Sequence, residues 1–562
     1  MHPPAPTPST PPGRPLSRWI KAIALILILL GIGFRSTNLD LKPFWEDEVY
    51  TITRVSGYQG QTIREQLDQQ RLTVADLEKY RDPQAGQSWL ETMSALASTP
   101  EHTPLYFMLL RVWSGIFGHS TAALRSLSVV FSVVGIGVFY LLGRSLFPTD
   151  NAMGDAAGWG TMTLASVSPL LLRYAQETRS YSLWIIGLGL SLWALLRAWR
   201  SPSKQNWCIY GLTLVLAFYT HLLTLLVIVA HGIALIIHGL LNRWQQTPLK
   251  GWLQTTLISC IFMGPWLALV VRQREMIKAR TNWQAASRTL GVLMHSWGKN
   301  FSHTWLEIPA PLQPMWYLFP IVCFIGVAIT SFYLWRHSQR NSIVTVLSFT
   351  LVPTLAILAM DLLSGGQRST INRYLIPAYV GLLTLSGSAL GCMLAGRVGQ
   401  RRLSVKTVGL WSGSVLLLLL SNLSMGELHR ASTWWHRSSH IPNFVHVITK
   451  EPDAILVTDR RIGETLALTY ALPPEQELIW IEHFSLPNST GKKGTDKKDS
   501  QEGTQGKRFS LPIEDRDGIV LFTPTKPLQE VVQKQRKAPL PDPIADEHKP
   551  NLNLRFLPPA KP

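Results

Sequence analysis

Long apolar blocks alternate with short polar loops along most of the chain. A helix that crosses a membrane needs about 20 mostly apolar residues, and about eleven blocks approach that length, so the pattern predicts about eleven membrane-spanning helices. The predicted spans cover residues 19–34, 122–147, 157–174, 180–199, 206–220, 222–241, 251–271, 314–335, 342–361, 374–395 and 408–424.

The segment 35–121, between the first two spans, decides the topology. Its one apolar piece, 104–117, is interpreted as a re-entrant or surface helix, because this choice puts the basic clusters of the later loops on one side. Those clusters are Arg197/Arg200/Lys204, Arg243/Lys250, Arg336/Arg340 and Arg397/Arg401/Arg402/Lys406. The positive-inside rule assigns that side to the cytoplasm. We therefore expect a multi-pass membrane protein with a cytoplasmic N-terminus and an extracytoplasmic C-terminus.

The same topology sets the expected domains. A disordered cytoplasmic tail, 1–18, precedes a transmembrane domain over 19–424 with external loops 35–121 and 272–313. Short β-rich runs at Ala454–Thr458 and Ile519–Phe522, with helical patterns at 437–449 and 462–472, predict a small external α/β domain over 425–537. That domain contains a lysine-rich, low-complexity insert, 491–508, and a Pro-rich disordered tail follows at 538–562. The fold class is thus an all-α polytopic membrane protein with a small C-terminal α/β domain.

One basic cluster breaks the topological rule. Arg272, Arg274, Lys278 and Arg280 begin an external loop. The cluster is either a solvated surface helix or a landing surface for anionic lipid head groups, and both interpretations stay open.

Composition agrees with a membrane protein and argues against nucleic-acid binding. Of 562 residues, 46% are hydrophobic and 16% are charged, and the formal net charge is +18. The basic residues lie in short loops, as topology requires, and do not form a groove-reading face. The four cysteines lie within apolar stretches without CxxC spacing, so they indicate neither a zinc site nor a disulfide framework.

The strongest chemical signal is the acidic triplet Glu46-Asp47-Glu48, which follows the first span. Adjacent carboxylates repel one another, and aromatic neighbours reduce their hydration, so the pKa of one carboxyl can rise toward a value that suits a general base. The alternative is that two of the three cap or solvate the next helix. A divalent cation on these oxygens is a further option, although a triplet alone is weak evidence for it.

Other ionisable candidates fall at the predicted outer ends of helices. Arg373, beside Tyr374, suits an anion because a guanidinium can pair with two phosphate oxygens; it could instead anchor its helix at the interface. His102 could donate to a phosphate or be a surface histidine. Glu177 with Arg179 could be a local ion pair, and His221 could be a packing residue. Gln176 completes this set.

This one-sided arrangement favours an enzyme over a transporter. Transporters usually carry polar groups near the midplane of the bilayer, yet a polytopic transporter or lipid flippase remains the alternative function. No GxxxxGK[ST] or GxGxxG segment occurs and the predicted cytoplasmic loops are short. An activated substrate would therefore arrive within the membrane, as a polyprenyl phosphate does.

Four passages together resemble the GT-C superfamily of polytopic glycosyltransferases. The nearest branch looks like the bacterial relatives of dolichyl-phosphate-mannose protein mannosyltransferases and the lipid A aminoarabinose transferase (glycosyltransferase families 39 and 83). The passages are 45–51, containing the acidic triplet; 102–106 with 117–118 and 123–126; 168–169 with 173–181; and 373–378. Their order matches the family across roughly residues 20–424. One departure is Thr103, where the family usually has proline.

The resemblance implies inverting transfer of a hexosyl or pentosyl group from a polyprenyl-phosphate donor to a lipid, glycan or protein acceptor. On this sequence it implies that Asp47 is the general base and that Glu48 supports it. His102 and Arg373 would face the donor phosphate, and Gln176 and Glu177 would line the sugar side. Tyr106, Arg179, His221 and Tyr374 complete the expected donor site. No cofactor is firmly implied.

Overall fold

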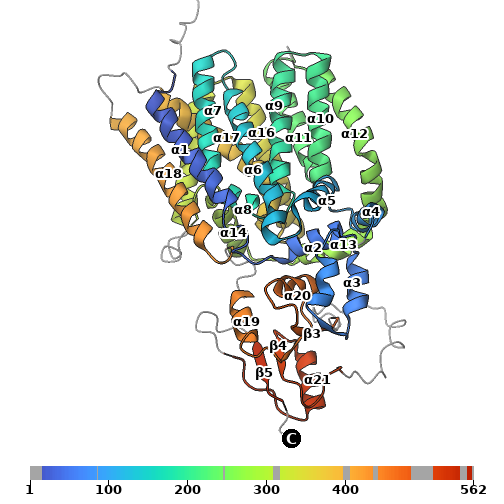
Figure 1. The fold of residues 1–562 in the computed structure, drawn as a ribbon. Coiled ribbons are helices and arrows are strands. Elements are labelled where there is room, and N and C mark those ends of the chain that lie inside the picture. The colour runs from blue at the N-terminus through green and yellow to red at the C-terminus, as the bar shows by residue number, and fades with distance from the viewer. Residues whose placement is uncertain are drawn as a thin grey trace, which may run out of the picture. The chain divides into compact units, whose positions relative to one another are not determined.

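A computed structural model describes most of the chain and divides it into two compact units. The described residues are 15–84, 87–244, 247–307, 317–395, 405–434, 441–482, 511–544 and 553–559. The first unit, here the membrane unit, comprises Met1–Leu39 and Leu96–Ala431. The second comprises Asp40–Ala95 and Ser432–Pro562 and is here called the external unit, after the location that the sequence predicts for it. In the described residues the membrane unit is built from helices, whereas the external unit contains a β-sheet (Figure 1).

The membrane unit confirms a polytopic helical protein. Eight helices among the described residues are long and apolar enough to cross a membrane. They are α1 (Arg18–Ser36), α6 (Thr121–Arg144), α9 (Tyr181–Arg200), α11 (Thr224–Leu241), α12 (Leu249–Arg272), α15 (Leu318–His337), α16 (Arg340–Ser364) and the stretch Asn372–Ala395, which contains α17 (Ile376–Ala395). The remaining predicted spans correspond to shorter or partly described helices: α7 (Asn151–Ser166), α10 (Lys204–Thr220) and α18 (Val405–Arg430).

Two short helices matter for the site. Helix α5 (Leu105–Phe117) has 13 residues, too few for a span, in agreement with the predicted surface or re-entrant helix. The predicted span 157–174 is broken after α7, and the chain restarts as α8 (Pro169–Ala175). Pro169 occupies the first turn of α8, where its missing N–H leaves no helical bond unmade, and Ser168 caps that turn. This break places residues 176–180 in a loop within the bundle.

Close contact between α7 and α17 gives the bundle its core. A Cβ on Gly160 would lie 2.3 Å from the carbonyl oxygen of Gly387, and one on Gly391 would lie 1.9 Å from that of Ala156. Only glycine permits such an approach, as is common between membrane helices. Helix α17 is accordingly almost completely buried.

The external unit is a small α/β domain, as predicted. Its five-stranded sheet has the order β1-β3-β2-β4-β5. The central strands β3 (Glu477–Trp480), β2 (Ile455–Thr458) and β4 (Ile519–Phe522) are parallel, and the two edge strands pair in the antiparallel sense. Helices α19 (Ile441–Ile448), α20 (Ile462–Thr469) and α21 (Lys526–Arg536) accompany the sheet (Figure 1). Apolar residues of β2, β3 and β4 form its core with Leu528 and Val532 of α21.

The boundaries of the external unit differ from the expected domain 425–537. Edge strand β1 (Arg71–Thr73) comes from the predicted loop 35–121, which also supplies α2 (Glu46–Val55), α3 (Gly60–Leu67), the short helix η1 (Ala75–Tyr80) and α4 (Trp89–Ala97, whose last two residues belong to the membrane unit). The other edge strand, β5 (Leu554–Leu557), lies within the tail expected to be disordered, 538–562. Edge strands this short carry no clear periodic signal, because main-chain pairing with a neighbour defines them. The expected insert 491–508 lies outside the described residues, as do Arg397, Arg401, Arg402 and most of the N-terminal tail.

Candidate active site

The acidic triplet forms the first turn of α2. Carboxylates are favourable at this place because the partial positive charge of a helix N-terminus attracts them. Oε2 of Glu48 accepts the backbone N–H of Trp45 at 3.4 Å, and Glu46 lies 3.6 Å from Arg461 of the same unit. The predicted capping role is therefore observed for Glu48. Neither contact involves the carboxylate of Asp47, whose backbone carbonyl accepts the hydroxyl of Thr51 at 2.8 Å.

The surroundings of the triplet are aromatic and partly buried. Glu48 is completely buried, and Phe44 packs edge-on against Tyr470 with ring centroids 4.7 Å apart. Burial raises the pKa of the Tyr470 hydroxyl, Arg81 lowers it, and the negative charge of Glu48 raises it again. The hydroxyl of Tyr50 accepts the backbone N–H of Gly463 at 3.3 Å, and burial raises its pKa to about 12. These contacts fix α2 against α20 and keep the triplet partly desolvated.

Within the membrane unit, three predicted site residues from distant parts of the chain share an electrostatic environment. The pKa of His221 is lowered to about 3, chiefly by burial and then by the positive charges of Arg179 and Arg373. His221 lies between α10 and α11, Arg179 between α8 and α9, and Arg373 in the short helix η5 (Asn372–Leu375). The fold thus brings two guanidinium groups near enough to a neutral imidazole for their charges to act on it.

The imidazole of His221 is fixed in orientation. Its ring stacks on Trp184 at a centroid distance of 4.1 Å. Its Nδ1 accepts the backbone N–H of Leu223 at 3.2 Å, so in the neutral ring Nε2 carries the hydrogen. His221 is therefore both a packing residue and an oriented hydrogen-bond donor.

A hydrogen-bonded chain connects Tyr106 to the loop of Arg179. The buried hydroxyl of Tyr106 lies 2.8 Å from that of Ser128 on α6, and Ser128 donates to the carbonyl oxygen of Arg179 at 3.2 Å. The guanidinium of Arg179 lies over the ring of Tyr181, 5.3 Å from its centroid. His102, just before α5, contacts Phe107 with centroids 6.1 Å apart. Helix α5 thereby supports the Arg179 loop through Tyr106.

Glu177 pairs with a residue that the sequence analysis did not single out. Its Oε1 accepts Nε of Arg173 at 2.8 Å, and both side chains are almost fully buried. The pair between Glu177 and Arg179, one option that the sequence left open, stays a prediction beside this observed pair with Arg173. An i,i+4 pair of opposite charges beside an apolar helix was the available signal.

Gln176 holds the end of α1. Its Nε2 donates to the carbonyl oxygens of Phe34 and Thr37 at 2.8 and 2.9 Å. These carbonyls lie in the last turn of α1 and just beyond it, where intrahelical partners run out. The amide nitrogen of Gln176 therefore joins α1 to the loop that follows α8.

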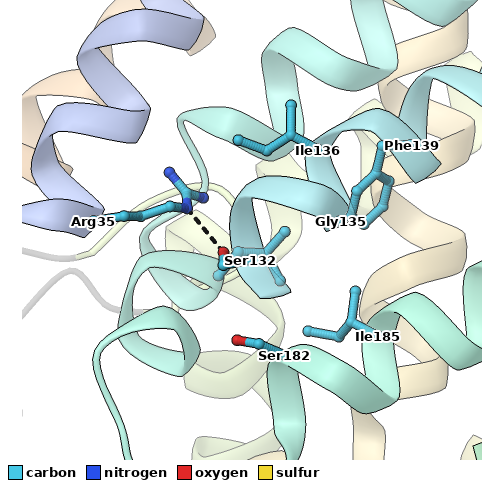
Figure 2. A pocket seen from close by; sticks show the side chains of 8 residues that line it. Arg35, Ser132, Gly135, Ile136, Phe139, Ser182 and Ile185 are labelled. Carbon is cyan, nitrogen blue, oxygen red and sulfur yellow. Dashed lines mark hydrogen bonds between the residues drawn. The ribbon is translucent and has the colours of Figure 1, made fainter. Parts of the chain in front are cut away.

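Arg35 is a buried residue whose guanidinium connects several helices, and it was not among the residues predicted from the sequence. Figure 2 shows its guanidinium reaching from α1 toward Ser132 of α6, to which it donates at 3.0 Å, beside a small cavity that Ser182 and Ile185 of α9 also line. The same group donates to the carbonyl oxygens of Gly31, Ala165 and Ser166. It thus donates to carbonyl groups at the end of α7 that have no intrahelical partner, next to the break that precedes α8.

Arg373 and Tyr374 lie in a loop with many contacts to other elements. The guanidinium of Arg373 lies 5.6 Å from the ring centroid of Tyr374, and the hydroxyl of Tyr374 accepts Nε2 of Gln284 at 2.8 Å. Gln284 belongs to the short helix η2 (Asn282–Ala285) of the predicted external loop 272–313. The conformation of the Arg373 segment is therefore set partly by that loop.

The predicted site residues are divided between the two units. Asp47 and Glu48 belong to the external unit, and His102, Tyr106, Gln176, Glu177, Arg179, His221, Arg373 and Tyr374 belong to the membrane unit. The structure gathers Arg179, His221 and Arg373 within the membrane unit. A cavity shared by Asp47 and Arg373 stays a prediction.

A family comparison bears on these residues. Residues 101–268 match the family model "Dolichyl-phosphate-mannose-protein mannosyltransferase". The matched region contains His102, Tyr106, Gln176, Glu177, Arg179 and His221. No protein of curated function matches the chain significantly.

Solved structures show a distant likeness. ArnT from Cupriavidus metallidurans, bound to undecaprenyl phosphate, is 13% identical with a TM-score of 0.47, and the alignment covers 80% of this chain and 84% of that one. An oligosaccharyltransferase from Archaeoglobus fulgidus, tethered to an acceptor peptide, is 13% identical with a TM-score of 0.42, and the coverage is 82% and 64%. These values are too low to support an argument by themselves. The family match therefore stands by itself: over residues 101–268 this multi-pass membrane protein resembles the dolichyl-phosphate-mannose-protein mannosyltransferases.

Proposed function

We propose that this protein is an inverting glycosyltransferase that moves a hexosyl or pentosyl group from a polyprenyl monophosphate to an acceptor hydroxyl. The reaction would take place at the outer face of the bacterial plasma membrane, with the N-terminus cytoplasmic and the C-terminus outside. One observation carries the proposal: Arg179 and Arg373 are both close enough to His221 to lower its pKa. Two guanidiniums beside a neutral imidazole donor form a suitable seat for a phosphate.

The chemistry requires a base opposite that cationic seat. The acceptor oxygen attacks the anomeric carbon, the bond from that carbon to the phosphate oxygen breaks, and its electron pair leaves with the polyprenyl phosphate. The acceptor proton passes to Asp47, a transfer that typically contributes about 10²–10⁴-fold to the rate. Arg179 and Arg373 stabilise the negative charge that grows on the departing phosphate.

The other residues have supporting roles in this proposal. Glu48 is fixed by the backbone of Trp45 and tunes Asp47 electrostatically. His102, Tyr106, His221 and Tyr374 face the donor phosphate and its sugar. Gln176 and Glu177 lie on the sugar side, and their bonds to the end of α1 and to Arg173 fix this loop before the substrate arrives.

A divalent cation at Glu46, Asp47 and Glu48 is a separate prediction. Carboxylate oxygens suit Mg²⁺ or Ca²⁺, but Glu46 has Arg461 nearby and Glu48 caps its own helix. Among the described residues no cluster of His, Cys, Asp or Glu is arranged to hold a metal ion. No step above is routed through a metal. Loss of activity on chelation, with recovery on return of Mg²⁺, would establish a metal requirement.

The acceptor is a lipid, a glycan or a secreted protein, so the test should not assume one. Envelope glycolipids and glycoproteins are compared by mass analysis in cells that carry the wild-type protein, Asp47→Asn or no protein. We expect Asp47→Asn to behave as the null strain while inserting in the membrane normally. Glu65→Gln, at an exposed position on α3 of the same unit, is the matched control and should keep the modification.

Two outcomes would count against this proposal. If Asp47→Asn retains the full modification, Asp47 is not the base. If the null strain loses transport of a lipid-linked sugar but no transfer step, the lipid-transport alternative replaces it.

A further inference from the structure

Asp361 is a buried carboxylate to which no role has yet been given. It lies in the last turn of α16, and its side chain is 0% exposed. A carboxylate in such a place is costly unless donors satisfy it. Its Oδ2 accepts both the backbone N–H and the hydroxyl of Ser369 at 2.6 Å, and its Oδ1 lies 3.3 Å from Arg368. All three donors come from the loop that carries Arg373.

That loop, residues 365–375 (the Arg373 loop), has little regular structure of its own. It consists of two short 3₁₀ turns, η4 (Arg368–Thr370) and η5, after a pair of glycines. Gly365 and Gly366 have φ values of +73° and +130°. A Cβ on Gly366 would also lie 2.7 Å from Oδ1 of Asp361. Only glycine lets the chain leave α16 and fold back over this carboxylate.

The external loop holds the Arg373 loop from a second direction. The indole of Trp297, on α14 (Leu290–Ser302), donates to the hydroxyl of Ser369 at 2.8 Å, and Asn300 donates to the carbonyl of Thr370 at 2.9 Å. Gln284 donates to Tyr374 and, through its own carbonyl, accepts the backbone N–H of Gln367 at 2.9 Å. Ser369 is therefore shared between Asp361 and Trp297, so both partners constrain the same residue.

These contacts lie on both sides of Arg373 along the chain. Ser369 and Thr370 are held by side chains on α16 and α14, and Tyr374 is held by Gln284, which leaves the backbone of Arg373 between fixed points. A long arginine side chain loses considerable conformational entropy when it is ordered on a ligand. A backbone fixed in advance reduces the part of this cost that falls at the moment of binding.

We propose that Asp361 is a positioning residue that, through Ser369, sets the Arg373 loop so that Arg373 can bind the donor phosphate. Gln284 acts as a second positioning residue through Tyr374. This inference rests on the proposed function, because it assumes that Arg373 receives a phosphate. It adds that donor affinity depends on a carboxylate that does not touch the donor.

The test measures binding of undecaprenyl phosphate to the purified full-length protein in nanodiscs. Arg373→Gln should weaken binding most. Asp361→Asn should weaken it about tenfold, which corresponds to ~1.4 kcal/mol. Ser369→Ala removes one of the two bonds to Oδ2 and should weaken binding about threefold. Asp361→Glu keeps both acceptor oxygens and should recover part of the affinity, which a general loss of packing would not allow.

Asp155→Asn is the matched control. Asp155, on α7, also accepts two side-chain hydrogen bonds, from Lys21 and Tyr140. Those partners lie near the start of α1 and on α6, away from the Arg373 loop. The Asp155→Asn protein should therefore bind undecaprenyl phosphate with the affinity of the wild type. Hydrogen exchange of the backbone amides at 368–375 gives a readout that needs no donor. It should accelerate in Asp361→Asn and stay unchanged in Asp155→Asn.

The outcomes separate the two proposals. If Asp361→Asn exchanges and binds like the wild type while Arg373→Gln loses binding, the positioning role is wrong. If Arg373→Gln itself binds normally, the proposed donor site is wrong, and the exchange data alone then decide whether Asp361 holds the loop.

Discussion

Nε of Arg173 lies 2.8 Å from Oε1 of Glu177, and both side chains are almost inaccessible to solvent. The pair spans one helical turn at the end of α8, where the loop that leads to Arg179 begins. Breaking a buried ion pair by removing one partner leaves an uncompensated charge, whereas removing both partners often costs little.

We therefore expect Glu177→Gln to lower the free energy of unfolding by about 3–5 kcal/mol. The double variant Arg173→Leu/Glu177→Leu should recover a large part of this loss. Thermal unfolding in detergent, followed by intrinsic tryptophan fluorescence, would measure both. A Glu177→Gln protein as stable as the wild type would show that water or another group compensates Arg173.

The lowered pKa of His221 predicts a pH dependence of stability. The ordinary pKa is 6.5 and the folded value is about 3, so the unfolded chain binds more protons between these values. The contribution of His221 to stability is fully present above about pH 6.5 and is lost as the pH falls toward 3. We expect the Tm of the wild type to fall over this window, and the fall to be smaller in His221→Gln. Identical pH profiles for the two proteins would contradict the lowered pKa.

Arg35 should be essential to the stability of the membrane unit. Its guanidinium satisfies the buried carbonyls of Gly31, Ala165 and Ser166 and the hydroxyl of Ser132. A buried group left without its partner costs about 1–3 kcal/mol, so Arg35→Met should destabilise the protein by several kcal/mol. Arg18→Met, at the exposed start of the same helix, is the control and should have little effect. Equal melting temperatures for the two variants would exclude this role.

A substitution at Gly463 can show whether residues 40–95 and the C-terminal part of the chain unfold together. A Cβ at this position would lie 2.7 Å from the ring of Tyr50, whereas a Cβ on Gly518 would meet nothing closer than 3.5 Å. Overpacking typically costs about 1–3 kcal/mol, so Gly463→Ala should speed proteolysis of both 40–95 and 432–562. Gly518→Ala should not. If Gly463→Ala exposed only one of these segments, they would not form a single cooperative unit.

Much of the architecture could be predicted because a bilayer restricts what a sequence can form. The apolar runs end close to the observed helices: for example, the predicted 180–199 is α9 at Tyr181–Arg200, and the predicted 251–271 is α12 at Leu249–Arg272. The alternative interpretation of the acidic triplet, that two of the three residues cap or solvate the next helix, agrees with its place in the first turn of α2. These features depend on local hydropathy and local capping, which the residues themselves carry.

Contacts between distant segments could not be predicted in the same way. Nothing in the local pattern connects Arg71–Thr73 or Leu554–Leu557 to a sheet whose centre lies at Ile455–Thr458, because an edge strand is defined by the backbone that it joins. Likewise, Glu177 could be placed near charged residues, but only the turn of α8 decided that Arg173 is its partner.

The sequence by itself determined that this chain is a multi-pass membrane protein, and it identified the residue types that bear chemistry. The tertiary structure decided that Arg179, His221 and Arg373 share one environment and that Asp361 holds the loop before Arg373. The physical reason is that hydropathy acts residue by residue along the chain. The electrostatic field at a group such as His221 depends instead on which charges from distant parts of the chain packing brings near it.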